Sequence, residues 1–131
     1  MTIKTIQVGP IMTNCYLLCD EASGRCALID PGDDAARVAR LVEQSGCTLQ
    51  YILLTHGHFD HVGSAQALKA EWNATLYCEA ADLAGDRMLP LTAADHSYQE
   101  GQQLAVDELK FTVWHTPGHT PGSVVLLCGE Y

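Results

Sequence analysis

Half of the histidines of this chain lie within one short stretch, THGHFDH, at residues 55–61. The stretch contains His56, His58, Asp60 and His61. Imidazole nitrogens and carboxylate oxygens suit Zn²⁺, Mn²⁺ and iron ions, and the absence of cysteine from the stretch argues against a closed structural zinc site. Scattered histidines do not normally fall at the spacing H-x-H-x-D-H. The spacing therefore predicts a metal centre rather than a helix-capping loop with surface histidines.

The backbone of the motif is expected to bring these side chains together. Residues two apart in an extended chain point to the same side, so His56, His58 and Asp60 converge if the chain stays extended as far as Asp60. Gly57 has no Cβ, which allows a tight turn between two ligands. Phe59, the one apolar residue of the motif, is expected to turn inward and anchor the loop.

A second candidate ligand, His119, lies between two Pro-Gly pairs in the stretch TPGHTPGS. Pro117 restricts Thr116 to an extended shape, and Gly118 permits a turn. Pro121-Gly122 repeats this arrangement, so His119 is expected on a rigid junction between two strands. By itself such a histidine is more often merely exposed, but the first cluster makes it a candidate ligand of the same site.

The remaining histidines are expected to lie outside the site. His96 falls in the polar stretch AADHSYQ, and His115 is expected to stay at the end of a strand. Asp30 ends the apolar run CALID. A carboxylate there is well placed to hold a ligating histidine by its other ring nitrogen, and equally well placed to be a simple turn aspartate or a helix cap.

Hydrophobic patterning predicts a mixed α/β domain around these residues. Apolar residues at helical spacing indicate one helix that ends near Ser45, with Gly46 as its stop signal, and a second helix after His61. A short helical piece is expected at 79–85, followed by a polar connection around 90–101. Strands are predicted at residues 3–8, 15–19, 26–30, 49–54, 74–78, 109–114 and 123–128.

Composition narrows the functional classes. The 131 residues suffice for one domain with one sizeable core. Lys and Arg number 7 against 16 Asp and Glu, a formal charge of −9, which argues against nucleic acid and anionic membrane surfaces as partners. No window approaches the ~18 apolar residues of a membrane span, and the start has no signal-like run, so a cytoplasmic protein is expected. The six cysteines form no C-x-x-C pair and are expected to be reduced and mostly buried.

The motifs together resemble a known family. THGHFDH and TPGHTPGS, preceded by NCYLL and LIDPG, are similar to the motifs of metallo-β-lactamase-fold hydrolases, most closely of the small glyoxalase II-like (hydroxyacylglutathione hydrolase-like) members. The resemblance runs from Ile3 to Leu127. It implies an αββα sandwich of the α/β class, with the active site at one edge between two sheets. Residues 1–131 would supply the N-terminal sheet, its helices and part of the second sheet, as a single incomplete domain.

The resemblance also implies two metal positions, with zinc as the expected ion and iron or manganese as alternatives. The matching residues divide into two sets: His56, His58 and His119 for the first ion, and Asp60 and His61 for the second. Family members carry, further on, an aspartate that bridges both ions and a last histidine, whereas this sequence stops before them. A fragment, or a chain whose exposed sheet face is covered by a symmetric homodimer, is therefore expected.

The implied activity is hydrolysis of a small-molecule thioester. By the family route, a metal-bound hydroxide attacks the carbonyl carbon, a thiolate leaves, and Asp60 and His61 are the catalytic groups beside the metal. Two alternatives remain open from the sequence. One is an iron-dependent persulfide dioxygenase, which shares the motifs. The other is a non-catalytic metal-binding half-domain that a partner chain completes.

Overall fold

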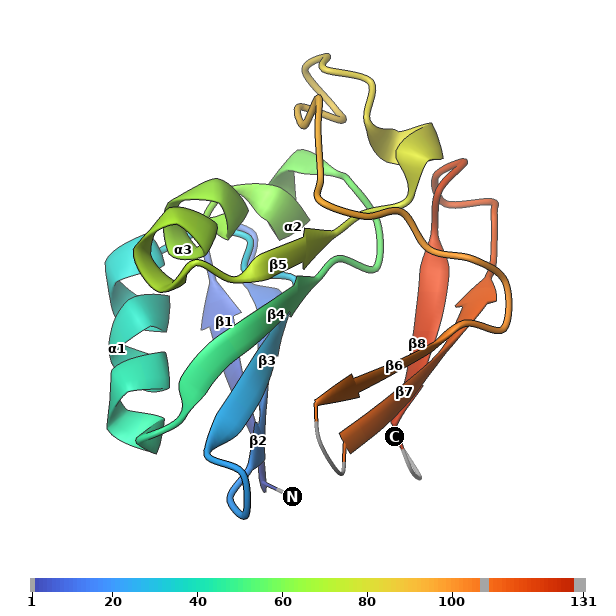
Figure 1. The fold of residues 1–131 in the computed structure, drawn as a ribbon. Coiled ribbons are helices and arrows are strands. Elements are labelled where there is room, and N and C mark those ends of the chain that lie inside the picture. The colour runs from blue at the N-terminus through green and yellow to red at the C-terminus, as the bar shows by residue number, and fades with distance from the viewer. Residues whose placement is uncertain (1, 107–108, 129–131) are drawn as a thin grey trace.

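Residues 2–106 and 109–128 are described by the computed structural model of the chain. They form two β-sheets that face each other, with the two longest helices on the outer side of the first sheet (Figure 1). This arrangement confirms the predicted α/β class and the expected share of the αββα sandwich. The first sheet has five strands in the order β1-β2-β3-β4-β5. Their bounds are Thr2–Val8, Thr13–Asp20, Arg25–Ile29, Thr48–Leu53 and Thr75–Tyr77.

The first sheet is antiparallel on one side and parallel on the other. β1, β2 and β3 pair antiparallel, whereas β4 pairs parallel with both β3 and β5. Parallel neighbours need a crossover, and helices supply it here. Because parallel strands end at the same edge of a sheet, Asp30 after β3 and the THGHFDH loop after β4 meet there.

The second predicted helix is divided in two. α1 runs over Ala35–Ser45 and ends at Gly46, as expected, and the following helices are α2 (Phe59–Val62) and α3 (Ala65–Trp72). At the break, a Cβ on Gly63 would lie 2.1 Å from the carbonyl oxygen of Gly32. The backbone of the Pro31-Gly32 turn therefore packs directly against the start of the second helical region.

Two apolar cores lie on the two faces of the first sheet. Leu17 and Leu28 pack with α1 and α3, whereas their neighbours Leu18 and Ala27 face the second sheet. This alternation follows from the two-residue period of a strand. All six cysteines are free and buried, as the sequence predicts.

The second sheet contains three antiparallel strands, β6 (Gln103–Val106), β7 (Leu109–His115) and β8 (Val124–Cys128). β7 and β8 were predicted, but β6 was not. Its four residues, QLAV, are too few to show a clear period, and pairing with β7 makes them a strand. The Tyr98 hydroxyl, which donates to the carbonyl of Leu54 at 3.0 Å, ties the preceding connection to the first sheet.

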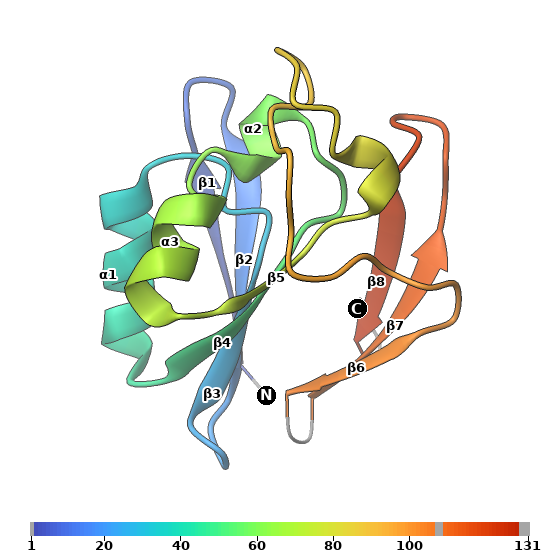
Figure 2. The same ribbon diagram turned by 45° about the horizontal axis from the view of Figure 1, so that its top comes forward.

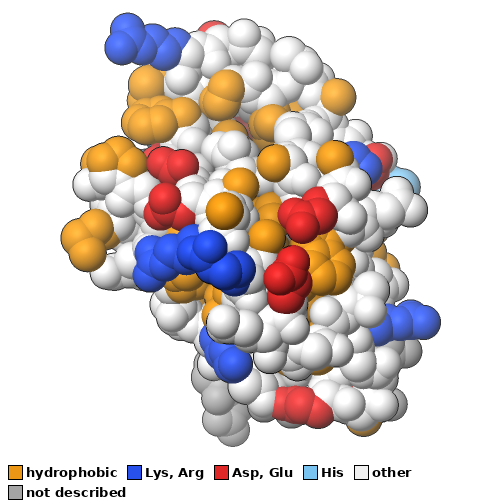
Figure 3. Space-filling view, turned by 90° about the vertical axis from the view of Figure 1, so that its left-hand side faces the viewer, with side chains coloured by type: hydrophobic (Ala, Val, Ile, Leu, Met, Phe, Trp, Pro, Cys, Tyr) orange, Lys and Arg blue, Asp and Glu red, His pale blue; other side chains and the backbone are white. Residues whose placement is uncertain are grey.

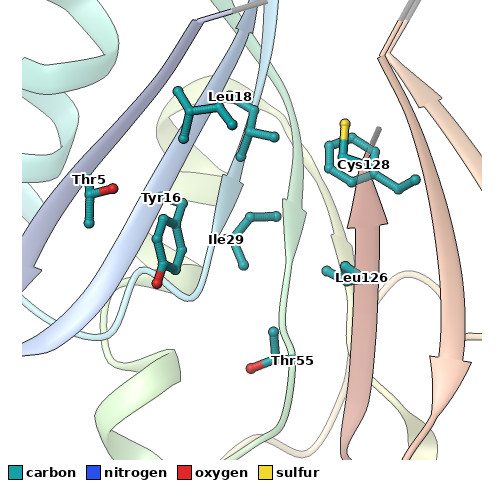
Figure 4. Close-up of a pocket in the computed structure, with 9 residues that line it drawn as sticks. Thr5, Tyr16, Leu18, Ile29, Thr55, Leu126 and Cys128 are labelled. Carbon is teal, nitrogen blue, oxygen red and sulfur yellow. The ribbon is translucent and has the colours of Figure 1, made fainter. Parts of the chain in front are cut away.

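A hollow of about 640 Å³ lies between the two sheets. Figure 4 shows Leu18 and Ile29 of the first sheet on one side and Leu126 and Cys128 of β8 on the other. Thr55, the residue before His56, also lines the hollow, so it extends to the base of the histidine loop. The remaining lining residues are Ile3, Thr5, Tyr16 and Phe111.

The outer surface carries charges of both signs. On the side of the molecule that Figure 3 shows, Lys and Arg side chains are interspersed with Asp and Glu side chains. Among the described residues, no helix is both long enough and apolar enough to span a membrane.

We predict that Gly63→Ala destabilises the fold. Gly63 has helical backbone angles (φ −56°, ψ −32°), so alanine can adopt this conformation without penalty. The loss of stability therefore measures the clash of the new Cβ with Gly32. The free energy of unfolding is expected to fall by about 1–3 kcal/mol or more, measured by chemical denaturation. Gln66→Ala, an exposed change in α3, is the control and is expected to stay within about 0.5 kcal/mol. Equal stability of the two variants would show that the close approach is unimportant.

Candidate metal centre

The predicted site residues gather at one end of the molecule. His56 and His58 lie in the loop after β4, Asp60 and His61 lie in α2, and His119 lies in the β7–β8 connection. Figure 1 and Figure 2 both show α2, the 3₁₀ helix η1 (Ala80–Asp82) and the β7–β8 connection at this end. The segment that follows β4 and the β7–β8 connection, which are distant in sequence, therefore meet at this end.

Three imidazole rings form the first group. One ring nitrogen each of His56, His58 and His119 lies within 4.8 Å of the other two. Nδ1 of His58 and Nε2 of His119 are 3.1 Å apart. The three rings cross nearly at right angles, with centroids 4.7–5.0 Å apart. Three nitrogen donors around one position are the donor set of a catalytic zinc or iron site.

His56 supplies the test of whether this group fits a metal ion. Its Nε2 atom is buried and has no hydrogen-bond partner among the described residues, while its Nδ1 atom lies 3.1 Å from the Thr55 hydroxyl. A buried polar atom without a partner is costly. Burial, followed by the charge of His61, lowers the pKa of His56 to about 4. The ring is therefore neutral, and its free nitrogen fits a metal ligand.

Asp30 holds His61 in place. The Asp30 carboxylate accepts hydrogen bonds from the Thr55 backbone N–H at 2.8 Å and from the Thr55 hydroxyl, and it lies 2.9 Å from Nδ1 of His61. Of the two interpretations left open by the sequence, the structure supports the one in which Asp30 orients a histidine. Burial opposes the charged form of His61, but the hydrogen bond and charge of Asp30, with the charge of Asp60, raise its pKa above the usual value.

Asp60 lies beside His61 rather than with the three-histidine group. One of its carboxylate oxygens accepts a hydrogen bond from the Thr13 hydroxyl at 3.0 Å and lies 3.3 Å from Nε2 of His61. The chain is not extended as far as Asp60, because α2 begins at Phe59. Asp30, His56 and His61 form the second group of potential ligands, and their ligand atoms also lie within 4.8 Å of one another.

The prediction that Phe59 turns inward is wrong. Its side chain is 49% exposed and lines, with Ile11 and Asp60, a small hollow of about 130 Å³. Its backbone N–H donates to the carbonyl of Met88 at 3.0 Å. The loop is anchored by polar contacts instead, because the fully buried Asp82 accepts a hydrogen bond from the Gly57 N–H.

Thr13 and Asp82 were not singled out from the sequence. Both are buried polar residues that contact the site from other elements, Thr13 from β2 and Asp82 from η1. Neither belongs to a local motif. The signal in the sequence is the glycines near the histidines, Gly57 and Gly122, which leave room for the Asp82 side chain. His96 and His115 lie outside both groups, and His115 pairs with Glu79 at 3.2 Å.

Comparison with known proteins agrees with this geometry. The sequence profile of the metallo-beta-lactamase superfamily matches residues 8–131. The hydroxyacylglutathione hydrolase GloC of Haemophilus influenzae is 34% identical over 138 residues, a match that covers 95% of this chain and 65% of that protein. Three curated relatives are matched over 63–65% of their own length, so this chain spans just under two thirds of each.

Two solved structures extend the likeness. ETHE1 from Myxococcus xanthus superposes with a TM-score of 0.85 and 30% identity, over 99% of this chain and 55% of that one. TTHA1623 in a di-iron-bound form superposes with a TM-score of 0.76 and 30% identity, over 95% of this chain and 66% of that one.

We predict that Asp30→Asn lowers stability even in the metal-free protein. Asn tolerates the left-handed conformation that Asp30 adopts (φ 53°), so the change isolates the loss of one carboxylate oxygen. The free energy of unfolding is expected to fall by about 1–3 kcal/mol, measured by urea denaturation. The exposed Asp33→Asn is the matched control. An Asp30→Asn protein as stable as this control would contradict the assigned role.

Proposed function

This chain belongs to the metallo-β-lactamase superfamily, and from that membership we propose that it is a metal-dependent hydrolase of thioesters. The observation that supports this most directly is the three-histidine group, in which the buried Nε2 of His56 has no hydrogen-bond partner among the described residues. In a folded protein such an atom is normally satisfied. A divalent cation at the position shared by His56, His58 and His119 satisfies it.

We assign five residues to metal binding. His56, His58 and His119 hold the first ion, and Asp60 and His61 contribute to a second position. Zinc is the expected ion, since three imidazoles with an open position are typical of catalytic zinc sites. Iron is the main alternative, supported by the likeness to TTHA1623 in its di-iron-bound form.

A bound divalent cation lowers the pKa of a water molecule toward ~7 and polarises a carbonyl oxygen. The protein residues position the other participants. Asp60, steadied by the Thr13 hydroxyl, orients the attacking water, and His61 is kept in one ring orientation by Asp30. The water would attack the carbonyl carbon and give up its two protons to solvent. The carbon–sulfur bond would break, the thiolate would leave with the electron pair, and the acyl group would be released as a carboxylate. A thiolate is a good leaving group, so no separate strong acid is needed.

An acyl thioester is the substrate class we propose. Hydroxyacylglutathione hydrolases among the relatives support it. We assign no identity to the thiol part of the substrate. The chain has 7 Lys and Arg against 16 Asp and Glu, so few basic side chains are available to bind a negatively charged thiol.

A second candidate is a metal-binding unit that acquires activity only with a partner chain. The hollow of about 640 Å³ between the sheets favours it, since an apolar cavity of that size gains stability when another surface closes it. In that case residues 1–131 are one incomplete domain, and a second copy of the chain is the simplest partner.

We predict that His58→Ala removes tight metal binding. The ring nitrogen of His58 is one of only three donors in the group, so its loss is expected to weaken affinity for Zn²⁺ more than about 100-fold, beyond the 10–100-fold of an outer-shell change. Competition with a chromophoric chelator measures the affinity. His96→Ala, a histidine outside both groups, is expected to bind as the unmodified chain does. Unchanged affinity in His58→Ala would refute the ligand assignment.

We also predict that thioester turnover depends on the ion. Removal of metal by a chelator should abolish hydrolysis of a hydroxyacyl thioester, and addition of Zn²⁺ should restore it. Elemental analysis and chromatographic size are measured on the same sample. A metal-loaded chain without turnover would favour the partner-dependent unit, and iron content with oxygen consumption would favour a persulfide dioxygenase.

A further inference from the structure

Asp82 connects the two loops that carry the candidate metal ligands. One carboxylate oxygen accepts hydrogen bonds from the Gly57 N–H and the Thr120 hydroxyl, each at 2.7 Å. The other oxygen accepts from the Gly122 N–H, also at 2.7 Å. Gly57 lies between His56 and His58, and Thr120 directly follows His119. A single side chain thus contacts a residue adjacent in sequence to every member of the three-histidine group.

The glycines of both loops are explained by this contact. A Cβ on Gly57 would lie 2.8 Å from Cβ of Asp82, and a Cβ on Gly122 would lie 2.8 Å from its carboxyl carbon. Neither glycine adopts a left-handed backbone conformation. These two positions are therefore glycine because Asp82 fills the space, whereas a Cβ on Gly118 of the same loop would meet nothing within 4 Å among the described residues.

Asp82 is buried, unlike an exposed aspartate that caps the end of a helix at the surface. Its side chain is fully buried, with 0% exposure, and within the described ranges it makes no ion pair with Lys or Arg. Burying a carboxylate is unfavourable unless its oxygens receive hydrogen bonds. The three donors supply them, and all three belong to the two ligand loops. Separation of the loops would leave the carboxylate with unsatisfied oxygens, which is strongly disfavoured.

The network around Thr120 extends this connection. The Thr120 hydroxyl lies 2.8 Å from the Ser123 hydroxyl, and the Thr120 N–H donates to the same Ser123 oxygen at 3.0 Å. The Val124 N–H donates to the carbonyl of Thr55 at 2.8 Å. Asp82 therefore contacts residues next to the candidate ligands, whereas the hydrogen bond from Val124 lies at the base of both loops.

We propose that Asp82 is a positioning residue that holds the His56–His58 loop and the His119 loop at the spacing needed to share one metal ion. This inference rests on the proposed metal-dependent function. His56 and His58 come from one segment and His119 from another, so their relative position must be maintained before the ion binds. Asp82 reduces the conformational freedom that metal binding must otherwise remove.

The central test is Asp82→Asn in the full chain. The amide NH₂ replaces one acceptor oxygen and faces an N–H or O–H donor, so at least one loop loses its bond. Titration with Co²⁺, followed by its visible absorption, is expected to give a 10–100-fold lower affinity, about the effect of removing an outer-shell partner. Asp20→Asn is the matched control, a buried aspartate at the far end of β2 that accepts from the Ala22 N–H. Equal Co²⁺ affinity of Asp82→Asn and the unmodified chain would overturn the proposal.

A double-mutant comparison separates positioning from a general loss of stability. If Asp82 acts by bringing His119 to the other two histidines, Asp82→Asn should change Co²⁺ affinity less than about 3-fold once His119→Ala is present. The same 10–100-fold loss in both backgrounds would mean that Asp82 acts through overall stability, and would overturn the positioning role.

A second pair of variants covers the case in which Asp82→Asn does not fold. Thr120→Val removes one donor to Asp82 at nearly constant volume, and Thr120→Ser keeps the hydroxyl. We expect Thr120→Val to weaken Co²⁺ binding by about 3–10-fold, the equivalent of one hydrogen bond, and Thr120→Ser to restore it. Equal affinities in this pair would overturn the proposal.

Amide hydrogen exchange of the metal-free chain gives a readout independent of the ion. In Asp82→Asn, or in Thr120→Val if the first does not fold, exchange should rise in peptides covering both 54–60 and 117–123, and stay unchanged in Asp20→Asn. If the unmodified chain takes up no Co²⁺, the proposed function fails, and exchange alone decides the role of Asp82. A joint rise in both peptides supports it, and unchanged exchange in either one overturns it.

Discussion

Buried carboxylates organise the functional end of this protein. Asp30, at the end of β3, receives hydrogen bonds from Thr55 and contacts His61, and Asp82, in η1, receives hydrogen bonds from the loops on both sides of the three-histidine group. Loops have few apolar contacts to hold them, so their position depends on such polar contacts. A carboxylate can accept several hydrogen bonds at once, and removal of one donor leaves a buried oxygen unsatisfied. This gives loop positions a rigidity that packing alone would not supply.

Close backbone approach is the second feature on which the site depends. The turn at Gly32 packs against the backbone of Asp60, and Gly63 packs against the carbonyl of Gly32. These contacts bring the end of β3 directly beneath α2, where Asp60 and His61 lie. Any side chain at either glycine would push α2 away from Asp30 and would separate His61 from the carboxylate that orients it.

The two sheets have unequal roles in this arrangement. The first sheet contributes four of the five candidate ligands, all from the segment that follows β4. The second sheet contributes His119 and closes one side of the hollow that reaches Thr55. The candidate metal ligands therefore come together only when the sheets are correctly placed, and the hydrogen bonds across the two loops are part of the interface between them.

The sequence by itself determined which residues are candidate ligands and most of the fold. The spacing H-x-H-x-D-H, the Pro-Gly pairs around His119 and the apolar runs predicted the candidate ligands, the helix that ends at Gly46 and seven of the strands, because these signals are local. The tertiary structure alone decided which residues support the ligands. Asp82 and Thr13 carry no local pattern, and β6 becomes a strand by pairing with β7. Phe59 is exposed, and the buried Asp82 accepts a hydrogen bond from its loop. Contacts between segments distant in the chain depend on how the sheets pack, and no single stretch of sequence encodes that packing.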